Sequence, residues 1–402
     1  MVESLSGARA PLMKAAQAAE VGDLAAVKTQ ALKALSFPEI SGIELIKAVE
    51  MLLDIGQESA ALRGLRKHCE GKAPRAQGFA QLGALHFEAG KTGPAARALE
   101  RALKMNPGDR QSAFLLADLR LQAALRTEAE EVWHRVFAAR PADTDIRLRA
   151  ASQMASFGAH NAAKRFVAEA EPLHDDPKEF AFMAAAITGT APPPLPDPGY
   201  IARFFDRTAE HYNASLQGVQ YRGPEILSAG LAALKIKPGA SLSVLDAGCG
   251  SGLSAPVLTP VAQRLDGLDI SPGILEEAAK TGAYNSLFTH DLARASLPEP
   301  EAYDLVTAMD VLIYCGDLTA PLTNMAQALK PGGRLFFTAE GTGKDSADWA
   351  LTPSGRYRHS LAYINDRLTA AGFTLPAQVS PVTLRNEFRR PVPGLAIAAT
   401  RT

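Results

Sequence analysis

A glycine-rich stretch in the second half of the chain offers a backbone turn that could hold a ligand. It reads VLDAGCGSG over residues 244–252 and begins with an apolar run. Glycines permit a sharp turn and let a ligand approach the backbone closely, because they carry no Cβ. Many strand-to-helix turns contain such a loop, so this one needs support from elsewhere in the sequence.

Two carboxylates and a second glycine motif follow at positions that suit a nucleoside. Asp269 lies 21 residues after Gly248, where a carboxylate can accept hydrogen bonds from both hydroxyls of a ribose. Asp291 follows a third apolar run, where it can accept from an adenine amino group while Leu292 covers the ring. The segment LKPGGR over residues 329–334 precedes a further apolar run. The four features together predict a nucleoside-binding site.

These features resemble the class I S-adenosylmethionine (AdoMet)-dependent methyltransferases. In that family an Asp-x-Gly-x-Gly-x-Gly loop, a ribose-binding acid, an adenine-binding acid and Leu-x-Pro-Gly-Gly occur in this order. The resemblance covers residues 240–340 well and the rest of the second half more loosely. It implies AdoMet as the methyl donor, with S-adenosyl-L-homocysteine as the product.

A nicotinamide dinucleotide site is the main alternative for a glycine loop followed by an acid. That fingerprint reads Gly-x-Gly-x-x-Gly, because a pyrophosphate rests on the helix N-terminus. Here the spacing is Gly-x-Gly-x-Gly, an acid precedes the first glycine, and Lys330 begins a Lys-Pro-Gly-Gly segment. Both differences favour AdoMet, which has no phosphate. A sheet that carries the loop without any cofactor is the other alternative.

A narrower resemblance lies upstream of the glycine loop. Residues 204–212 (FFDRTAEHY) and 221–227 (YRGPEIL) are similar to the opening of bacterial methyltransferases that also carry tetratricopeptide repeats. That likeness implies a cap formed by Tyr212 and contacts of Tyr221 and Arg222 with the methionyl end, whose carboxylate Arg222 can pair with. Alternatively, Phe205 and Tyr212 simply pack a capping helix on the sheet. The cofactor-binding residues expected from both resemblances are Tyr212, Tyr221, Arg222, Asp246, Gly248, Cys249, Gly250, Gly252, Asp269, Ile270, His290, Asp291, Leu292 and Met309.

The residues expected to act on the methyl acceptor follow the fourth and fifth predicted strands. Methyl transfer is an in-line displacement that depends on positioning and on exclusion of water. A base is needed only if the acceptor must lose a proton first. His359 is the best candidate base, since the pKa of a histidine lies near neutrality, and Asp310 is the second catalytic candidate; either could instead be structural. The expected substrate-binding residues are Tyr314, Glu340, Tyr357, Arg358 and Tyr363.

From about Tyr200 the sequence alternates between strand-like and helix-like segments. Such alternation predicts a mainly parallel sheet covered by helices on both faces, in a Rossmann-like α/β domain with seven strands. The expected strands span 243–246, 265–269, 286–290, 304–309, 334–339, 378–385 and 395–400. The expected helices between them span 256–264, 274–280 and 318–329.

Residues 1–188 show almost no strand signal and read as short helices rich in Ala and Leu. Pro107 and Pro141 lie 34 residues apart, and apolar residues recur at the same offset. The repetition resembles the tetratricopeptide repeat and predicts an all-α helical solenoid, in which stacked units bury each other's faces. Generic packing of alanine-rich helices is the alternative. The matching pairs are Ala95 with Ala129, Leu99 with Trp133, and Ala102 with Val136.

A proline-rich segment separates the two halves. Residues 189–199 (GTAPPPLPDPG) cannot join a helix or a central strand and read as a stiff, extended linker. We therefore expect three parts: a repeat domain at 1–188, the linker at 189–199 and a methyltransferase domain at 200–402.

Composition narrows the function classes. The chain has 402 residues, 47% of them hydrophobic, and a formal net charge of −1, which argues weakly against a nucleic-acid partner. Its three cysteines are isolated, so no disulfide framework and no metal site of familiar spacing is expected. No apolar signal core and no run of about 18 apolar residues occurs, so a cytoplasmic protein without a membrane anchor is expected.

Missing motifs narrow the acceptor. No [DN]-P-P-[YFW] tetrapeptide follows the fourth strand, which argues against methylation of adenine or a glutamine amide, and no Pro-Cys nucleophile for cytosine occurs. Three hypotheses stand: methylation of a protein or peptide recruited by the repeats, methylation of a small molecule with the repeats serving dimerisation or docking, and an AdoMet-binding scaffold without catalysis.

Overall fold

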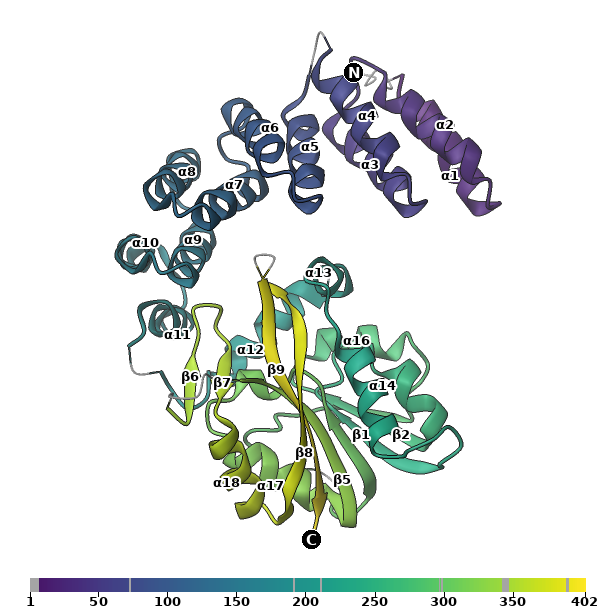
Figure 1. Cartoon of the computed structure of the whole chain (residues 1–402), viewed down its shortest axis with the longest axis vertical. Helices are drawn as coiled ribbons and strands as arrows, with labels where there is room; N and C mark the ends of the chain where they lie inside the picture. Colours follow the sequence, from purple (N-terminus) through teal and green to yellow (C-terminus); the bar gives the residue numbers. More distant parts are fainter. Residues whose placement is uncertain are drawn as a thin grey trace. The chain divides into compact units, whose positions relative to one another are not determined.

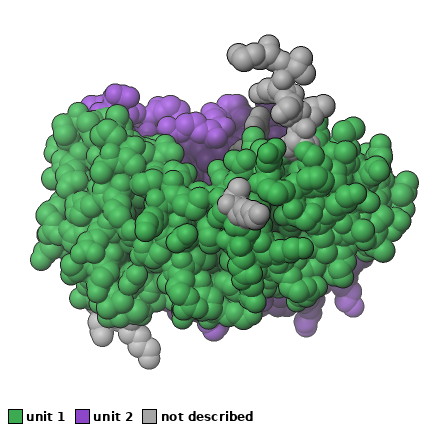
Figure 2. All heavy atoms as spheres, turned by 90° about the horizontal axis from the view of Figure 1, so that it is seen from above, with its two compact units in different colours: residues 1–173 green, residues 174–402 purple. Residues whose placement is uncertain are grey.

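The chain forms two compact units, residues 1–173 and residues 174–402, which Figure 2 distinguishes by colour. The computed structural model describes residues 7–71, 74–190, 192–209, 212–295, 297, 299–341, 347–387 and 390–402. None of the helices in these residues combines the length and the apolar character that crossing a membrane requires.

The first unit is built from helix pairs that repeat along the chain (Figure 1). The second helices of the pairs begin at residues 24, 58, 92, 126 and 160, so each starts 34 residues after the one before. The predicted period therefore extends over five pairs, although it was clear in the sequence for only two. The pairs are α1 (Arg9–Glu20) with α2 (Leu24–Leu35), α3 (Gly42–Asp54) with α4 (Glu58–Cys69), α5 (Ala76–Glu88) with α6 (Thr92–Met105), α7 (Arg110–Gln122) with α8 (Arg126–Ala139), and α9 (Thr144–Ser156) with α10 (His160–Ala170).

Small residues let the two helices of a pair approach closely. A Cβ added to Gly83 of α5 would lie 2.6 Å from Cγ of Leu99 of α6. Trp133 of α8 is fully buried, and its Nε1–H donates to Oε1 of Gln153 of α9 at 3.0 Å. Each first helix also contacts the first helix of the next pair, so the pairs stack as a helical solenoid.

The second unit begins with helices and continues as an α/β sheet. The helices before the sheet are α11 (Pro177–Thr188), α12 (Pro198–Thr208), α13 (Tyr212–Gly218) and α14 (Gly223–Ala233). The strands are β1 (Leu242–Ala247), β2 (Ala262–Asp269), β3 (Ser286–Thr289), β4 (Tyr303–Ala308), β5 (Leu329–Gly341), β6 (Trp349–Leu351), β7 (Tyr357–His359), β8 (Phe373–Glu387) and β9 (Arg390–Arg401). The intervening helices are α15 (Ala255–Leu258), η3 (Thr259–Val261), α16 (Pro272–Ala279), η4 (Leu312–Tyr314), α17 (Thr319–Ala328) and α18 (Leu361–Ala370).

The sheet is mainly parallel, as expected, and the order of its core strands is β3-β2-β1-β4-β5. β9 pairs antiparallel with β5, and β8 pairs antiparallel with β9. Helix α14 packs on one face of the sheet and helices α17 and α18 on the other (Figure 1). Parallel strands bring their carboxyl ends to one edge, so β1, β2, β3 and β4 all lead to the same place.

The described residues contain nine strands rather than the seven expected from the sequence. The two additional strands, β6 and β7, have three residues each, too few to show a period of two. β7 pairs with the end of β5, where His359 lies opposite Gly341. The helix expected at 256–264 is also shorter, because β2 already begins at Ala262.

The boundary between the units lies before the proline-rich segment rather than within it. Helix α11 belongs to the second unit, where Phe182 packs against Tyr200 and Tyr357. Segment 189–199, expected to be a linker, supplies carbonyl groups to this unit. The carbonyl of Pro193 accepts from Oη of Tyr357 at 2.6 Å, and that of Pro194 accepts from the N–H of Gly316 at 2.9 Å. An extended proline segment suits this role, because its carbonyls have no partners within the segment.

Candidate active site

The glycine loop leaves the end of β1 and folds back beside β2. The N–H groups of Gly248 and Cys249 both donate to the carbonyl of Leu268, at 2.7 and 2.9 Å. Gly248 has a φ of +73°, and a Cβ added there would lie 2.2 Å from Cγ2 of Val311. Only glycine therefore fits at this position, for both its conformation and its space.

Asp269 ends β2 and connects it to the glycine loop. Its Oδ2 accepts from the N–H of Gly250 and its Oδ1 accepts from the N–H of Ser271, both at 3.0 Å. Burial raises the pKa of Asp269 to about 6, although these backbone hydrogen bonds oppose the shift. Each oxygen retains a lone pair, so the carboxylate can accept from a ligand as well.

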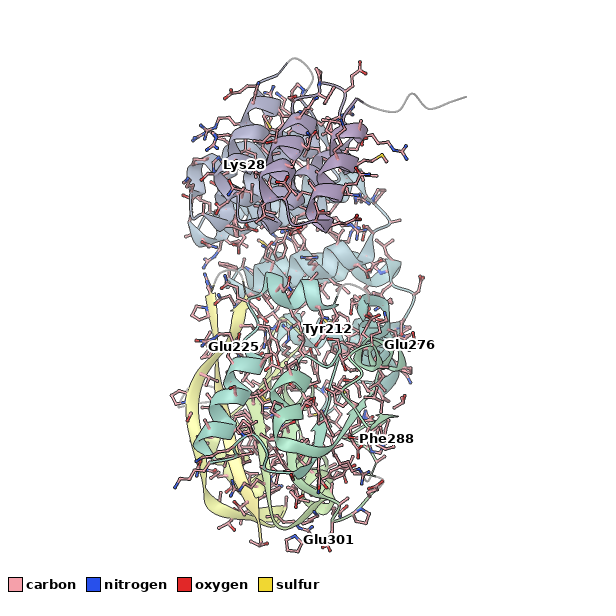
Figure 3. All side chains as sticks on the ribbon, turned by 90° about the vertical axis from the view of Figure 1, so that its right-hand side faces the viewer. Lys28, Tyr212, Glu225, Glu276, Phe288 and Glu301 are labelled. Carbon is pink, nitrogen blue, oxygen red and sulfur yellow. The ribbon has the colours of Figure 1, made fainter. Side chains whose placement is uncertain are left out.

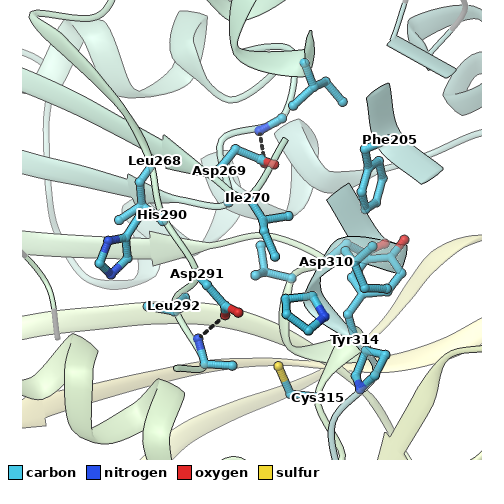
Figure 4. A pocket seen from close by; sticks show the side chains of 18 of the residues that line it. Phe205, Leu268, Asp269, Ile270, His290, Asp291, Leu292, Asp310, Tyr314 and Cys315 are labelled. Atoms are coloured by element: carbon cyan, nitrogen blue, oxygen red, sulfur yellow. Dashed lines mark hydrogen bonds between the residues drawn. The ribbon is translucent and has the colours of Figure 1, made fainter. Parts of the chain in front are cut away.

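A pocket extends from the loop along the carboxyl ends of the strands (Figure 4). Figure 4 shows His290, Asp291 and Leu292 at one end of it and Phe205 and Tyr314 at the other. Most of the lining is apolar. The predicted residues that line it are Tyr212, Gly248, Gly250, Asp269, Ile270, His290, Asp291, Leu292, Met309, Asp310 and Tyr314. The lining residues that were not predicted are Leu195, Pro196, Pro198, Ile201, Phe205, Leu268, Ile274, Ala293, Arg294, Val311 and Cys315.

Asp291 provides a carboxylate at the His290 end of the pocket. Its Oδ1 accepts from the N–H of Ala293 at 2.9 Å, and its Oδ2 lies 3.8 Å from Nη1 of Arg294. Arg294 in turn donates to the carbonyl of Pro196 at 2.6 Å. The proline-rich segment thus forms part of the wall at this end.

Three aromatic rings gather at the other end. The centroid of Phe205 lies 5.8 Å from that of Tyr212, where α13 begins (Figure 3), and 5.4 Å from that of Tyr314; both contacts are edge-to-face. Burial raises the pKa of the Tyr212 hydroxyl far above its usual range, so this hydroxyl is neutral. Glu210 and His211, which belong to the same motif, lie outside the described residues.

Asp310 lines the same end and is held from two sides. Its φ is +57°, which is unusual for a residue other than glycine and typical of strained functional positions. Its N–H donates to Oγ1 of Thr338 at 2.8 Å, and its Oδ2 lies 3.0 Å from Nη1 of Arg385. Burial raises the pKa of Asp310, and the charge of Arg385 opposes this shift.

Arg385 belongs to a charged cluster that sequence reasoning missed. Only 3% of its side chain is exposed, and it pairs with Asp310, Glu340 and Glu387. Arg358 pairs with Glu340 at 3.2 Å, so Glu340 and Arg358 are ion-pair partners and neither lines the pocket. A signal existed in the sequence, since arginine is unusual in the middle of an otherwise strand-like segment.

His359 occupies a different environment from the one expected of a general base. It is fully buried, outside the pocket lining, and its Nε2 lies 2.8 Å from the carbonyl oxygen of Cys315. Its ring lies parallel to that of Tyr363, with centroids 6.1 Å apart. Burial lowers its pKa, so it is neutral at physiological pH. A histidine in this position cannot reach an acceptor in the pocket and serves to fix β7 to η4.

Two tyrosines expected to bind substrate also support the scaffold. Tyr357 is fully buried, and its hydroxyl donates to Pro193. The hydroxyl of Tyr363 accepts from the N–H of Leu318 at 3.0 Å and donates to Asp317 at 3.2 Å. Neither lines the pocket.

Asp246 and Cys249 position the glycine loop rather than line the pocket. Asp246 is 1% exposed and accepts from Oη of Tyr284 at 2.9 Å and from Oγ1 of Thr307 at 3.0 Å. Burial raises its pKa to about 6. The side chain of Cys249 packs against Leu275 of α16, and burial raises the pKa of its thiol.

Tyr221, Arg222 and Gly252 likewise lie outside the pocket lining. Arg222 is exposed beside α14, and its N–H donates to the carbonyl of Leu384 at 2.9 Å. Tyr221 folds over the start of α14, where its hydroxyl would lie 2.0 Å from a Cβ at Gly223. The predicted contact of Arg222 with a methionyl carboxylate does not fit this placement.

Comparison with known proteins gives the family. The family model described as "Methyltransferase domain" matches residues 245–337. Methyltransferase-like protein 27 from Homo sapiens is 31% identical over 192 residues, which cover 45% of this chain and 78% of that protein. The chain belongs to the class I AdoMet-dependent methyltransferases.

More partial similarities join this methyltransferase to other named enzymes. Malonyl-[acyl-carrier protein] O-methyltransferase from Serratia marcescens is 30% identical over 143 residues, 36% of this chain and 53% of that one. Ubiquinone biosynthesis O-methyltransferase from Thiobacillus denitrificans is 32% identical over 108 residues, 25% of this chain and 45% of that one. The match thus spans about half the length of these two relatives. The solved magnesium protoporphyrin IX methyltransferase from Synechocystis PCC 6803 with bound SAM is 23% identical, with a TM-score of 0.40, over 52% of this chain and 98% of its own.

The pocket of the methyltransferase fits AdoMet. Gly248 keeps clear the space beside Val311 that a Cβ would fill, which lets a ligand lie against the backbone. Asp269 and Asp291 offer acceptors for a ribose and an adenine, and apolar side chains line the rest. AdoMet is the cofactor of this methyltransferase.

Proposed function

We propose that this methyltransferase methylates an acceptor carried on a protein, which its repeat unit recruits. The observation that carries the proposal is the run of five stacked helix pairs at a period of 34 residues. We assign these pairs to the tetratricopeptide class and the chain to the repeat-bearing bacterial methyltransferases. Stacked repeats present a long surface that suits extended protein partners.

The chain's own residues hold the cofactor and exclude water. When bound, AdoMet supplies an electrophilic methyl group on a positively charged sulfur. Asp269 accepts from the ribose hydroxyls, and Asp291 accepts from the adenine amino group. Phe205, Tyr212 and Tyr314 enclose the opposite end, where aromatic faces stabilise a cation and keep the reacting atoms out of water.

Asp310 is the residue we propose for orienting the acceptor. It lines the pocket at the aromatic end, and Arg385 and Thr338 fix its carboxylate. A carboxylate held in this way accepts a hydrogen bond from an O–H or N–H of the acceptor and turns its lone pair toward the methyl group. Full removal of the proton is needed only for an acceptor that is protonated at the working pH.

A small-molecule acceptor is the second candidate. It is favoured by the names of the relatives, which are O-methyltransferases for a malonyl group on a carrier protein and for ubiquinone biosynthesis. An oxygen nucleophile would suit the Asp310 position equally well. In that case the repeats would serve dimerisation or docking to an assembly.

Radiolabelled AdoMet distinguishes the two candidates. The full-length protein is incubated with a lysate of a strain that lacks its gene, and the lysate is separated into macromolecules and small molecules. We expect label on a protein band, removed when Asp269→Ala replaces the wild type. Label in the small-molecule fraction would overturn the protein acceptor in favour of the second candidate. Binding of AdoMet without any transfer would indicate a scaffold without catalysis.

A further inference from the structure

A groove between α6 and α8 of the first unit gathers basic side chains. Its charged lining is Arg97, Glu100, Arg101 and Lys104 of α6, Arg120 of α7 and Arg135 of α8. Five of these residues are positive and one is negative. All of them are at least partly exposed, so the groove presents a positive surface to solvent.

Glu100 shows how the groove receives a carboxylate. Its Oε1 lies 3.1 Å from Nη2 of Arg120, and its Oε2 lies 3.1 Å from Nη1 of Arg135. Two guanidinium groups from different helices thus share one carboxylate. Among the described residues, Arg97 and Lys104 form no ion pair, and their charges are available to a partner.

The floor of the groove is apolar. Ala96, Leu103, Pro107 and Ala138 lie between the basic side chains. A polynucleotide would use the positive rim and gain little from such a floor, since its affinity comes mainly from phosphates. A protein segment with acidic residues flanking apolar ones would use both the rim and the floor.

The positive surface continues beyond the groove toward α4. His86 is buried, and this burial, together with the charges of Lys91, Arg66 and Arg97, lowers its pKa. Arg66 and Lys91 therefore lie close enough to Arg97 to share one electrostatic environment with it. An acidic partner would be attracted over a region wider than the groove itself.

We infer that the groove between α6 and α8 docks an acidic amphipathic segment of a partner protein. The inference rests on the proposed function, because this partner is the protein that carries the acceptor. Docking itself requires neither AdoMet nor methyl transfer, so the two can be measured separately.

Fluorescence anisotropy on the full-length protein tests the inference. The probe is a labelled peptide of about 15 residues, about four helical turns, with Leu along one face and Glu on its flanks. The comparison probes are the same peptide with Lys in place of Glu, and a thymidine oligonucleotide of similar charge. We expect the acidic peptide to bind most tightly, with an affinity that falls as salt rises.

Two double variants of equal charge change locate the binding. Arg97→Glu with Lys104→Glu should weaken binding of the acidic peptide roughly 10-fold or more, because rim charges become repulsive. Lys14→Glu with Lys164→Glu, on the exposed faces of α1 and α10, should change it by less than about two-fold. Arg97→Gln with Lys104→Gln should give an intermediate loss.

Three results would overturn the inference: equal binding of the Lys peptide, tighter binding of the oligonucleotide, or an unchanged affinity of the Arg97/Lys104 variant. The labelled-AdoMet assay on the same variant separates this from the proposed function. Full labelling of a protein band by a variant that has lost peptide binding would reject the groove and leave the protein acceptor standing. Absence of any protein label with the wild type would instead reject the acceptor.

Discussion

The carboxylate of Asp269 accepts a hydrogen bond from the backbone N–H of Gly250, with Oδ2 and N 3.0 Å apart. The end of β2 is thereby fixed to the loop that follows β1. The same carboxylate also lines the pocket. Asp269 therefore both shapes the cofactor loop and offers acceptors to a bound ribose, so its charge state and its removal should affect AdoMet affinity directly.

We expect the affinity for AdoMet to fall as the pH drops below about 6, because burial raises the pKa of Asp269 to about 6. A protonated carboxyl accepts fewer hydrogen bonds. Calorimetric titrations between about pH 5 and 8 measure the effect. The Asp269→Asn variant should lose this dependence, and a wild-type affinity that is constant over the range would contradict the assignment.

The stability of the free protein should change in the opposite direction. Burial raises the pKa values of both Asp246 and Asp269 to about 6, above the value of 3.8 for an unperturbed Asp. Between about pH 4 and 6 the folded chain thus keeps protons that the unfolded chain releases, and the free energy of unfolding falls as the pH rises. Urea unfolding across this window checks the sign; a free energy of unfolding that rises through it would show that these carboxyls are not buried as described.

Gly248→Ala should abolish AdoMet binding. The new Cβ would lie 2.2 Å from Cγ2 of Val311, and the φ of +73° adds a conformational cost of about 1–2 kcal/mol. Gly239→Ala is the matched control, because its φ is +83° but nothing lies within 4 Å of the new Cβ. Calorimetry should show normal binding for the control and partial recovery when Val311→Ala accompanies Gly248→Ala. Normal binding by the single Gly248 variant would mean that the ligand lies elsewhere.

His359→Phe should lower stability and leave the pH profile of methyl transfer unchanged in shape. The substitution keeps a ring beside Tyr363 but removes the partner of the Cys315 carbonyl, which costs about 1–3 kcal/mol. Thermal unfolding and the pH profile of kcat measure the two effects. Loss of one limb of the profile, with stability intact, would restore His359 as a general base.

A fragment of residues 174–402 should fold and bind AdoMet, whereas a fragment of residues 200–402 should bind it weakly. The shorter fragment lacks Leu195, Pro196 and Pro198 of the pocket wall and the carbonyl of Pro193 that pairs with Tyr357. Calorimetry and thermal unfolding of the two fragments compare these losses. Equal behaviour of both would return the proline-rich segment to the role of a free linker.

The cofactor half of the site could be predicted from the sequence because its determinants are local. Asp269 and Asp291 each follow a strand directly, and parallel strands bring their ends to one edge. The 34-residue period of the first unit is also a local signal, since each pair repeats the same helix lengths.

The acceptor half could not be predicted, because it depends on pairing between distant residues. Arg385 meets Asp310 across 75 positions of sequence, and no local pattern joins them. The depth of His359 is likewise set by how β7 pairs with β5. A histidine in a loop and a buried histidine on a three-residue strand look alike in sequence, so the chemical role assigned to it failed where burial decided the outcome.

Calorimetric titration of AdoMet into the wild type, Asp269→Ala and Glu276→Ala tests the central assignment most directly. Glu276 is an exposed carboxylate on α16, also labelled in Figure 3, and serves as the matched control. We expect the wild type and Glu276→Ala to bind alike. Asp269→Ala should bind roughly 10- to 100-fold more weakly, since hydrogen bonds to a charged group contribute about 1.5–3 kcal/mol. Binding by Asp269→Ala as tight as by the wild type would contradict the placement of the cofactor in this pocket.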